Sequence, residues 1–203
     1  MSGNNTYQKI FNLENKTVVL TGSSGFLGSQ FADVLSAAGA NVVLADKEEN
    51  ENKKLEIKLR KKYNTTPLVC KVDVADKKSI IHMKKIILKK FKKIDVLVNN
   101  AYLNPNQSKY SSIPFEKFPL DLWNQVLAVN LTSVFLCSQE IGKTMVKQKN
   151  GVIINISSIY GLLGADQRIY GASKLNSPVS YAATKGAIIN LTRYLAAYWN
   201  RKN

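Results

Sequence analysis

Three tyrosines in the sequence are each followed four positions later by a lysine, a pairing that suits proton transfer. The pairs are Tyr170 with Lys174, Tyr181 with Lys185, and Tyr198 with Lys202. On a helix, residues four apart share a face, so a lysine ammonium can stand beside a phenol. A free phenol, with a pKa of about 10, is a poor base at neutral pH, and a nearby cation stabilises its phenolate. Such a pair predicts a general acid and base acting on a carbonyl or carbinol oxygen.

A glycine-rich segment near the N-terminus has the composition of a phosphate-binding turn. Residues 21–28 read Thr-Gly-Ser-Ser-Gly-Phe-Leu-Gly and lie between a predicted strand and a predicted helix. Glycines let the backbone approach a pyrophosphate closely, and free N–H groups at a helix start attract its charge. The residues expected to contact a dinucleotide here are Gly22, Ser24, Gly25, Phe26, Leu27 and Gly28.

Both kinds of residue need a scaffold, and the chain supplies alternating strand and helix patterns. Apolar runs predict strands at residues 17–21, 41–45, 68–72, 95–98 and 152–156. Helical periodicity predicts helices at 26–38, near 47–63, near 77–92, at 121–147 and from 178 onward. For the last helix, Ser177 is expected to be the cap and Pro178 the first helical residue. The alternation predicts an α/β fold, a Rossmann-type doubly wound parallel sheet in three α/β/α layers.

Length and composition suit one globular domain. The 203 residues, of which 45% are apolar, exclude a disordered or collagen-like chain and are expected to form a single domain spanning 1–203. The strand and helix pattern runs on without a linker or repeat. In a sheet of this kind a ligand lies beyond the carboxyl ends of the strands, so the residues directly after each strand are candidates.

Asp46 follows the second predicted strand, eighteen residues after Gly28. A carboxylate there can accept both hydrogen bonds of an adenosine ribose and would repel a 2′-phosphate. We therefore expect NAD as the preferred cofactor, with NADP as the alternative because Lys47 could offset the repulsion. An aspartate at a strand end is also a common turn former, so a purely structural role stays open.

Further motifs follow the later strands, and together with the turn and Asp46 their order resembles the short-chain dehydrogenase/reductase family along nearly the whole chain. They are Asp73-Val74 after the third strand, Asn99-Asn100-Ala101 after the fourth, Asn130 in the long helix and Ile156-Ser157-Ser158 after the fifth. The resemblance implies an NAD(P)-dependent oxidoreductase that interconverts an alcohol and a carbonyl. It also implies that Asp73 and Val74 lie at the adenine and that Asn100 and Ala101 line the cofactor groove. A second interpretation, that Asn99 and Asn100 tie neighbouring strands together, is compatible with the first.

In this family the general acid and base is a tyrosine followed four residues later by a lysine. Hydride transfer between nicotinamide and a carbinol carbon needs matching proton transfer at the oxygen, the task assigned to Tyr181. By resemblance, Lys185 also holds the nicotinamide ribose, and Ser158 hydrogen-bonds the reacting oxygen, with Ser157 the less favoured neighbour. Asn130 is expected to hold a water that relays protons to Lys185. The alternative for Asn130 is a mid-helix amide that only hydrogen-bonds a neighbouring segment.

Two tyrosines compete for the catalytic role, whereas Tyr198 lies late in the last predicted helix, far from any strand end. Tyr170 stands 12 residues after Ser158, close to the family's usual separation. Pro178, however, would break a helix running on from Tyr170, at a cost of about 3 kcal/mol. Tyr181 falls in the first turn of a helix that starts at the proline, and the sequence after it resembles the family's helix. We favour Tyr181, which leaves an insertion of about ten residues as a substrate-facing loop.

The sequence also departs from the family pattern. Its glycine spacing resembles the sugar-nucleotide epimerase and dehydratase branch, and Tyr102 stands where a glycine usually follows Asn-Asn-Ala. The sequence stops at Asn203, where the family continues with another strand, a cofactor-closing turn and a substrate lid. The alternative function is therefore a truncated or non-catalytic Rossmann domain that binds a dinucleotide or a partner without turnover.

The net charge of +15 does not indicate a nucleic-acid partner. Residues 47–93 hold 16 basic and 6 acidic residues on two helical patterns, mainly as lysine and with few aromatics for base stacking. We expect a solvated lysine-rich surface, a small-molecule alcohol or carbonyl substrate, no membrane segment and no metal. A homo-oligomer through helices 121–147 and 178–202 is expected if the C-terminus is complete. Cys70 and Cys137 lie in apolar segments and suit buried reduced thiols in a cytoplasmic protein.

Overall fold

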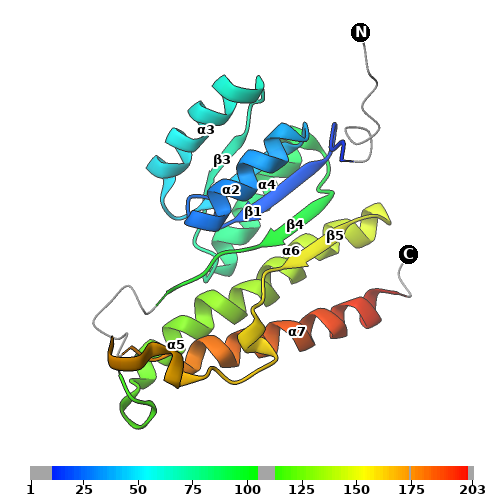
Figure 1. Ribbon diagram of the computed structural model, residues 1–203. Helices are drawn as coiled ribbons and strands as arrows, with labels where there is room; N and C mark the ends of the chain where they lie inside the picture. The colour runs from blue at the N-terminus through cyan, green and yellow to red at the C-terminus, as the bar shows by residue number, and fades with distance from the viewer. Residues whose placement is uncertain (1–10, 105–112, 174, 201–203) are drawn as a thin grey trace.

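A computed structural model describes residues 11–104, 113–173 and 175–200 (Figure 1). Within these residues, five parallel strands form one sheet in the order β3-β2-β1-β4-β5. The strands are β1 (Thr17–Thr21), β2 (Asn41–Asp46), β3 (Leu68–Lys71), β4 (Val96–Asn99) and β5 (Val152–Asn155). The strand order reverses between β1 and β4, so the carboxyl ends of these two strands flank the crevice in which such sheets bind ligands.

Helices on both faces of the sheet make the outer layers (Figure 1). α2 (Phe26–Ala37) and α3 (Glu49–Tyr63) cover one face, whereas α4 (Lys77–Phe91) and α6 (Ser133–Gln148) cover the other. α5 (Leu120–Leu127) leads into α6, and α7 (Val179–Trp199) lies beside α6 at the β5 end of the sheet. The predicted doubly wound, three-layer α/β fold is confirmed.

Alternate residues of the central strands fill two separate cores. Val19 and Leu97 face α4 and α6, whereas Val18 and Leu20 face α2 and α3, and all four are fully buried. Strands that are buried on both faces read as continuous apolar runs, which is why the sequence of β1 was recognisable. The outer strand β5 differs, because Val152 is 53% exposed on the side of α2.

The long helix predicted at 121–147 is present but interrupted. η3 (Ala128–Thr132) is a π-helical turn between α5 and α6, and Asn130 is buried at its centre. A π-turn adds one residue to the helical repeat and is often found at functional sites. Hydrophobic periodicity did not reveal it, because the apolar face continues on both sides of the turn.

By length and composition alone, residues 120–148 could cross a membrane. In the structure, however, Cys137, Ile141 and Met145 of this stretch pack into the core against the sheet. The core helix of a soluble protein passes the same compositional test, so this helix does not indicate a membrane protein.

α7 begins one residue later than predicted. Pro178 is its N-cap, with φ −63° and ψ 134°, and Val179 is the first helical residue. The expected Ser177 cap was wrong: the N–H of Ser177 donates to the side-chain oxygen of Gln167 at 2.9 Å, and its carbonyl oxygen accepts from the same amide at 3.4 Å. Gln167 lies in η5 (Gln167–Ser173), so the loop before α7 is held by an amide clamp instead of a serine cap.

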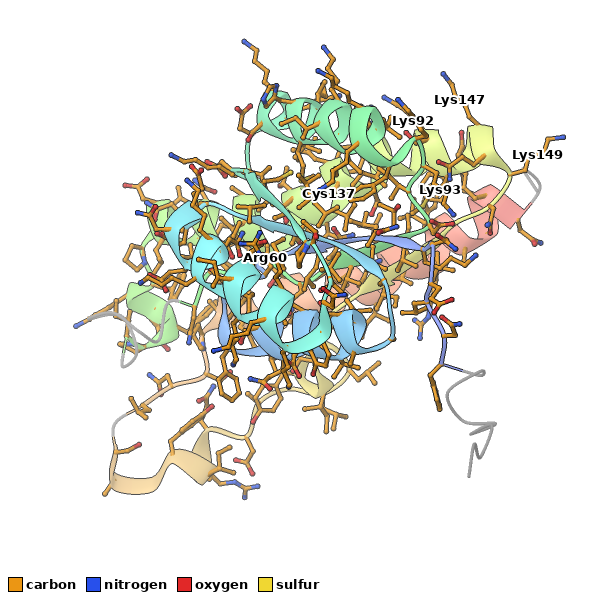
Figure 2. The ribbon with its side chains drawn as sticks, turned by 90° about the horizontal axis from the view of Figure 1, so that it is seen from above. Arg60, Lys92, Lys93, Cys137, Lys147 and Lys149 are labelled. Atoms are coloured by element: carbon orange, nitrogen blue, oxygen red, sulfur yellow. The ribbon has the colours of Figure 1, made fainter. Side chains whose placement is uncertain are left out.

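Several lysines lie at the rim of the molecule, and the two thiols lie inside it (Figure 2). Figure 2 shows Lys92 after α4, and Lys147 and Lys149 at the end of α6, all at the periphery. Cys137 is 1% exposed, and burial raises the pKa of its thiol to about 12. Cys70 is buried as well, so the prediction of two buried reduced thiols is confirmed.

Candidate active site

Two glycines of the turn after β1 are required by close packing. Gly22 has φ +66°, and a Cβ atom on it would lie 2.7 Å from the Cα atom of Ala101. A Cβ atom on Gly28 would overlap the carbonyl oxygen of Gly22, so α2 can approach the turn only with glycine at this position. The packing of the turn therefore accounts for Gly22 and Gly28 without a ligand.

Gly25 has no such packing reason to be glycine. It is exposed, and a Cβ atom on it would come no nearer than 3.4 Å to its closest neighbour, the carbonyl oxygen of Gly22. Gly25 is also the N-cap of α2 and provides no side-chain cap, so the first backbone N–H groups of the helix, including those of Phe26 and Leu27, face the same open space. An uncapped helix start beside an open glycine fits a dinucleotide pyrophosphate.

Asp46 stands at the carboxyl end of β2 and braces the glycine turn. Its Oδ2 atom accepts a hydrogen bond from the N–H of Ser24 at 3.0 Å, and its Oδ1 atom accepts from the N–H of Glu48 at 3.2 Å. The structural role that the sequence left open is thus present. Each carboxylate oxygen can accept a further hydrogen bond, so these contacts leave capacity for a ribose.

The buried side-chain amide of Asn52 also holds the glycine turn, through a hydrogen bond. Asn52 of α3 is fully buried, accepts a hydrogen bond from Ser23 Oγ at 2.8 Å and donates to the carbonyl oxygen of Leu44 at 3.0 Å. Sequence reasoning missed this residue, because an asparagine within a lysine-rich helix carries no signal that it points inward.

Asn99 and Asn100 tie neighbouring segments together at the end of β4. The Asn99 side chain donates to Asn155 Oδ1 at 2.8 Å, and the Asn100 side chain donates to the carbonyl oxygen of Thr21 at 3.0 Å. Thr21 Oγ1 in turn accepts from the N–H of Ala101 at 3.1 Å. The strand-tying interpretation is confirmed, and it places Asn100 and Ala101 directly beside the glycine turn.

Asp73 and Val74 follow β3 at the same edge of the sheet as Asp46. Asp73 is exposed, its Oδ1 atom accepts from the N–H of Ala75 at 2.9 Å, and its own N–H donates to Ser79 Oγ at 3.0 Å. Val74 packs into the core beside α4. These contacts fix the turn, and the expected contact with adenine stays a prediction.

Tyr181 and Lys185 occupy the first two turns of α7, next to the carboxyl end of β5. The Lys185 Nζ atom donates to the carbonyl oxygen of Ile156 at 2.6 Å and lies 5.8 Å from the centre of the Tyr181 ring. Lys185 is only 6% exposed, and this burial lowers the pKa of its ammonium group to about 8. The predicted pair therefore shares one helix face, with a lysine whose charge is only partly solvated.

The segment after β5 is fitted closely to the backbone around Lys185. Ser157 Oγ donates to the Lys185 carbonyl oxygen at 2.8 Å, and a Cβ atom on Gly161 would lie 2.7 Å from the same oxygen. Ser158 starts η4 (Ile159–Gly161), and its Oγ atom accepts from the N–H of Tyr160 at 3.2 Å. The Ser157 hydroxyl is thereby used in a structural hydrogen bond, whereas among the described residues the Ser158 hydroxyl makes a local contact with Tyr160.

Asn130 is engaged by a neighbouring loop. Its Oδ1 atom accepts from the N–H of Leu103 at 2.8 Å, and its Nδ2 atom donates to the Leu103 carbonyl oxygen at 3.3 Å. The alternative interpretation, an amide that hydrogen-bonds a neighbouring segment, therefore holds. A role for Asn130 in holding a water stays a prediction.

Aromatic rings that were not assigned to the site surround Tyr181. The ring centres of Tyr102 and Tyr160 lie 5.5 Å and 6.4 Å from that of Tyr181, both in edge-on arrangements. Burial, followed by the neighbouring phenol of Tyr170, raises the pKa of Tyr160 above its usual value. Tyr170 itself lies outside α7, in the 3-10 segment η5, so it reaches the rim of this cluster through Tyr160. The only sequence signal for Tyr102 was its departure from the family's glycine.

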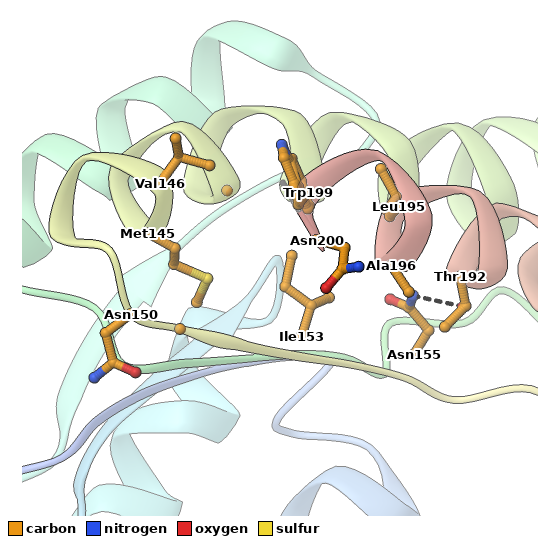
Figure 3. A pocket seen from close by; sticks show the side chains of 12 residues that line it. Met145, Val146, Asn150, Ile153, Asn155, Thr192, Leu195, Ala196, Trp199 and Asn200 are labelled. Atoms are coloured by element: carbon orange, nitrogen blue, oxygen red, sulfur yellow. Dashed lines mark hydrogen bonds between the residues drawn. The ribbon is translucent and has the colours of Figure 1, made fainter. Parts of the chain in front are cut away.

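Two cavities accompany the site. One of about 380 Å³ is lined by residues of the 113–118 segment, by residues within 165–167 and 176–178, and by Val179 and Ala182 of α7. The other, of about 290 Å³, lies between α6, β5 and α7 and contains none of the predicted site residues (Figure 3). Figure 3 shows Met145 of α6 and Trp199 of α7 beside it, with Asn155 hydrogen-bonded to Thr192 at 2.9 Å. Neither cavity is lined by Ser158, Tyr181 or Lys185, and the first comes nearest to them along the chain, at Ala182.

Comparison with known proteins agrees with this geometry. The family described as short chain dehydrogenase matches residues 16–203. The chain therefore belongs to the short-chain dehydrogenase family.

Named relatives are 30–34% identical to this chain over the aligned residues. The 5-keto-D-gluconate 5-reductase of Escherichia coli K12 is 34% identical over 194 residues, which cover 96% of this chain and 70% of that protein. The NAD-dependent glycerol dehydrogenase of Listeria innocua is 30% identical over 95% of this chain and 68% of its own length. The crystal structure of levodione reductase superposes with a TM-score of 0.83 at 25% identity, covering 94% of this chain and 69% of that one.

Proposed function

We propose that this chain is an NAD(P)-dependent oxidoreductase that interconverts a small-molecule alcohol and its carbonyl, with Tyr181 as the general acid and base. The observation that carries the proposal is the position of Tyr181 and Lys185 on one face of α7, beside the carboxyl end of β5. The glycine turn lies at the same edge of the sheet. The reductase and dehydrogenase names of its relatives support this class of reaction.

Cofactor binding in this proposal uses residues from three strand ends. The open space at Gly25 and the start of α2 would receive the pyrophosphate, and Asp46 would accept the hydrogen bonds of the adenosine ribose. Lys185 would hold the nicotinamide ribose. The bound nicotinamide supplies or accepts the hydride. Since Asp46 would repel a 2′-phosphate, NAD is the preferred cofactor and NADP the alternative.

Proton transfer falls to the residues around Tyr181. In reduction, the Tyr181 hydroxyl would donate a proton to the carbonyl oxygen while Ser158 Oγ hydrogen-bonds that oxygen. The ammonium group of Lys185 would stabilise the phenolate that remains. Leu103 takes one hydrogen bond at each group of the Asn130 amide, so a relay water would use the remaining donor or acceptor of this amide or a backbone carbonyl of the η3 turn.

We propose the cavity at the start of α7, which Ala182 helps to line, as the place of the substrate's apolar part. The 165–178 loop and the 113–118 segment form its walls, with Phe115, Phe118 and Val179 giving them apolar character. This placement supports a substrate with an apolar part extending from the reacting carbon. Two free buried thiols suit a cytoplasmic location, and the helix pair α6 and α7 is the proposed surface for a homo-oligomer.

A direct test measures binding and turnover separately. Fluorescence titration of the purified chain with NADH and NADPH reports binding, and a panel of ketones and secondary alcohols reports turnover. We expect NADH binding and cofactor-dependent turnover of at least one compound class. Failure to bind either dinucleotide would overturn the proposal at its first step.

A second candidate function is a domain that binds a dinucleotide or a partner without turnover. Two features away from Tyr181 favour it. Among the described residues β5 pairs only with β4, and a cavity lies between α6, β5 and α7. Saturable NADH binding with no turnover across the panel would support this candidate. The Tyr181→Phe variant would then behave as the unmodified chain in every assay.

A further inference from the structure

Tyr102 contacts both members of the proposed catalytic pair. The Lys185 Nζ atom lies 5.4 Å from the centre of the Tyr102 ring and 5.8 Å from that of Tyr181. The two rings meet edge-on, with centres 5.5 Å apart and planes inclined by 69°. Edge-to-face rings attract each other, and a cation within about 6 Å of a ring centre is stabilised by the ring's electrons. The ammonium group is therefore enclosed by two aromatic rings from different segments.

The backbone on both sides of Tyr102 is fixed by the fold. The N–H of Ala101 donates to Thr21 Oγ1 at 3.1 Å, and the N–H of Leu103 donates to Asn130 Oδ1 at 2.8 Å. The Asn130 amide also donates to the Leu103 carbonyl oxygen at 3.3 Å. The backbone at Tyr102 is thus anchored to β1 on one side and to the π-turn η3 on the other. This anchoring restricts the positions that the Tyr102 ring can occupy.

We propose that Tyr102 is a positioning residue of the catalytic pair: its ring holds the Tyr181 ring edge-on and closes the aromatic enclosure around the Lys185 ammonium group. The proposal rests on the proposed function of Tyr181 and Lys185. A glycine at position 102 would leave that side of the lysine open to water. The substitution of a large ring for the family's small residue therefore changes the surroundings of the pair itself.

The enclosure has a measurable electrostatic consequence. Burial is the one cause that lowers the pKa of Lys185 to about 8, and the groups that face the ammonium are the Ile156 carbonyl and the phenols Tyr102 and Tyr181. Among the described residues, no carboxylate forms an ion pair with Lys185. Since the pKa of Lys185 lies below its ordinary value, burial outweighs the attraction of the rings for the ammonium. Removing the Tyr102 ring should therefore let water reach the ammonium and raise its pKa, because hydration favours the charged form.

The experiment is trace acetylation of the cofactor-free protein with acetic anhydride across a pH series, with Lys185 modification read by mass spectrometry. The variants are Tyr102→Phe, which keeps the ring, and Tyr102→Gly, which removes it. We expect the labelling midpoint of Lys185 to stay near its original pH in Tyr102→Phe and to rise by about one pH unit in Tyr102→Gly. Tyr102→Ala provides the same test if the glycine variant does not give a cooperative melt.

Tyr160→Ala is the matched control, because Tyr160 also packs edge-on against Tyr181, at 6.4 Å between ring centres. This variant should leave the Lys185 midpoint unchanged. In turnover assays Tyr102→Gly should lower kcat on the order of tenfold with little change in KM or in the Kd of NADH, as misplacement of a proton donor does. An unchanged midpoint and unchanged kcat in Tyr102→Gly would overturn the proposal. If the unmodified chain shows no turnover, the proposed function fails while the labelling result still decides the role of Tyr102.

Discussion

The side-chain nitrogen of Lys185 lies 2.6 Å from the carbonyl oxygen of Ile156, the residue that directly follows β5. One residue further along, Ser157 Oγ donates back to the Lys185 carbonyl oxygen at 2.8 Å. These two hydrogen bonds hold the second turn of α7 against the carboxyl end of the sheet. Lys185 is therefore both a structural tie and the only cation in contact with the Tyr181 ring among the residues that the structure describes.

The burial of Lys185 predicts how stability depends on pH. Because folding lowers the pKa of this ammonium from 10.5 to about 8, the folded chain binds fewer protons than the unfolded chain between these values. Stability from this group should therefore rise with pH across that window. Urea unfolding of the unmodified chain and of Lys185→Met at a series of pH values tests this. Between pH 8 and 10.5, the free energy of unfolding of the unmodified chain should increase by about 1–3 kcal/mol relative to that of the variant. Parallel curves for the two proteins would contradict this expectation.

Glu140 predicts a loss of stability in acid. Its carboxylate on α6 is 5% exposed, and hydrogen bonds from Lys84 at 2.8 Å and Lys143 at 2.9 Å lower its pKa to about 2. Such a group stabilises the fold above its unfolded pKa of about 4.3, and this contribution is lost as the pH falls through the folded value. Glu140→Gln should lower the free energy of unfolding by about 1–2 kcal/mol at neutral pH. The effect stays this small because solvent reaches the partly exposed lysines and screens the ion pairs.

Chemical denaturation of both proteins between pH 7 and 2 measures this effect. The difference in unfolding free energy should narrow as the pH falls below about 4. Glu51→Gln is the matched control, since the Glu51–Lys54 pair at 2.7 Å is exposed and should contribute little. If the Glu140→Gln variant is as stable as the unmodified chain at neutral pH, the ion pairs of Glu140 do not contribute to stability.

Asp46 predicts the choice of cofactor. Its carboxylate is held by the N–H groups of Ser24 and Glu48, so it cannot swing away from a 2′-phosphate without releasing the glycine turn. The chain should bind NADH more tightly than NADPH, and Asp46→Ala should narrow this preference by on the order of tenfold. Fluorescence titrations give the Kd values. Gly25→Val, which fills the open space at the start of α2, should weaken the binding of both cofactors equally. If the unmodified chain binds NADPH as tightly as NADH, Lys47 outweighs the repulsion of the 2′-phosphate by the Asp46 carboxylate.

The scaffold was predictable from the sequence because its signals are local. Buried strands such as β1 appear as apolar runs in the sequence. Pro178 marks the start of α7, because a proline has no backbone N–H and its ring would disrupt a helix continuing through it. The capping of α7 was not predictable in the same way. Gln167, ten residues before Ser177, takes the backbone groups that the serine was expected to arrange.

The surroundings of the candidate site were less predictable because they join distant segments. Tyr102 after β4, Tyr160 in η4 and Tyr181 in α7 meet only in the folded chain. Asn130 in the π-turn and the inward-pointing Asn52 likewise hydrogen-bond Leu103 and Ser23, which lie far from them in the sequence. Spacing identified which residue types could act, whereas the contacts that hold them depend on tertiary packing.

The outer edge of β5 predicts self-association of the 203-residue chain. Val152 and Ile154 are 53% and 45% exposed, and β5 pairs only with β4 among the described residues. An apolar strand with a free edge favours pairing with another strand. Analytical ultracentrifugation should show concentration-dependent association, and the double variant Val152→Lys with Ile154→Lys should reduce it. A monodisperse monomer at high concentration would refute this expectation.

The competing tyrosines can be separated by removing one hydroxyl at a time. Tyr181 stands on the same helix as Lys185, whereas Tyr170 lies in η5, where Gly171 has φ +49° and interrupts the helical backbone. Tyr181→Phe should abolish turnover and leave the Kd of NADH nearly unchanged, because only the proton-transferring group is lost.

Tyr170→Phe is the matched control for this test. It removes the same atom from a residue that, among the described contacts, is linked to Tyr181 through Tyr160, so it should lower kcat by no more than about threefold. Steady-state kinetics and NADH titration of both variants, with cooperative melts as the check on folding, complete the comparison. If Tyr170→Phe is the inactive variant, the separation of 12 residues from Ser158 was the better guide and the argument from Pro178 fails. If both variants keep full activity with a verified substrate, neither phenol is the proton donor, and the acid and base must be sought elsewhere at the carboxyl edge of the sheet.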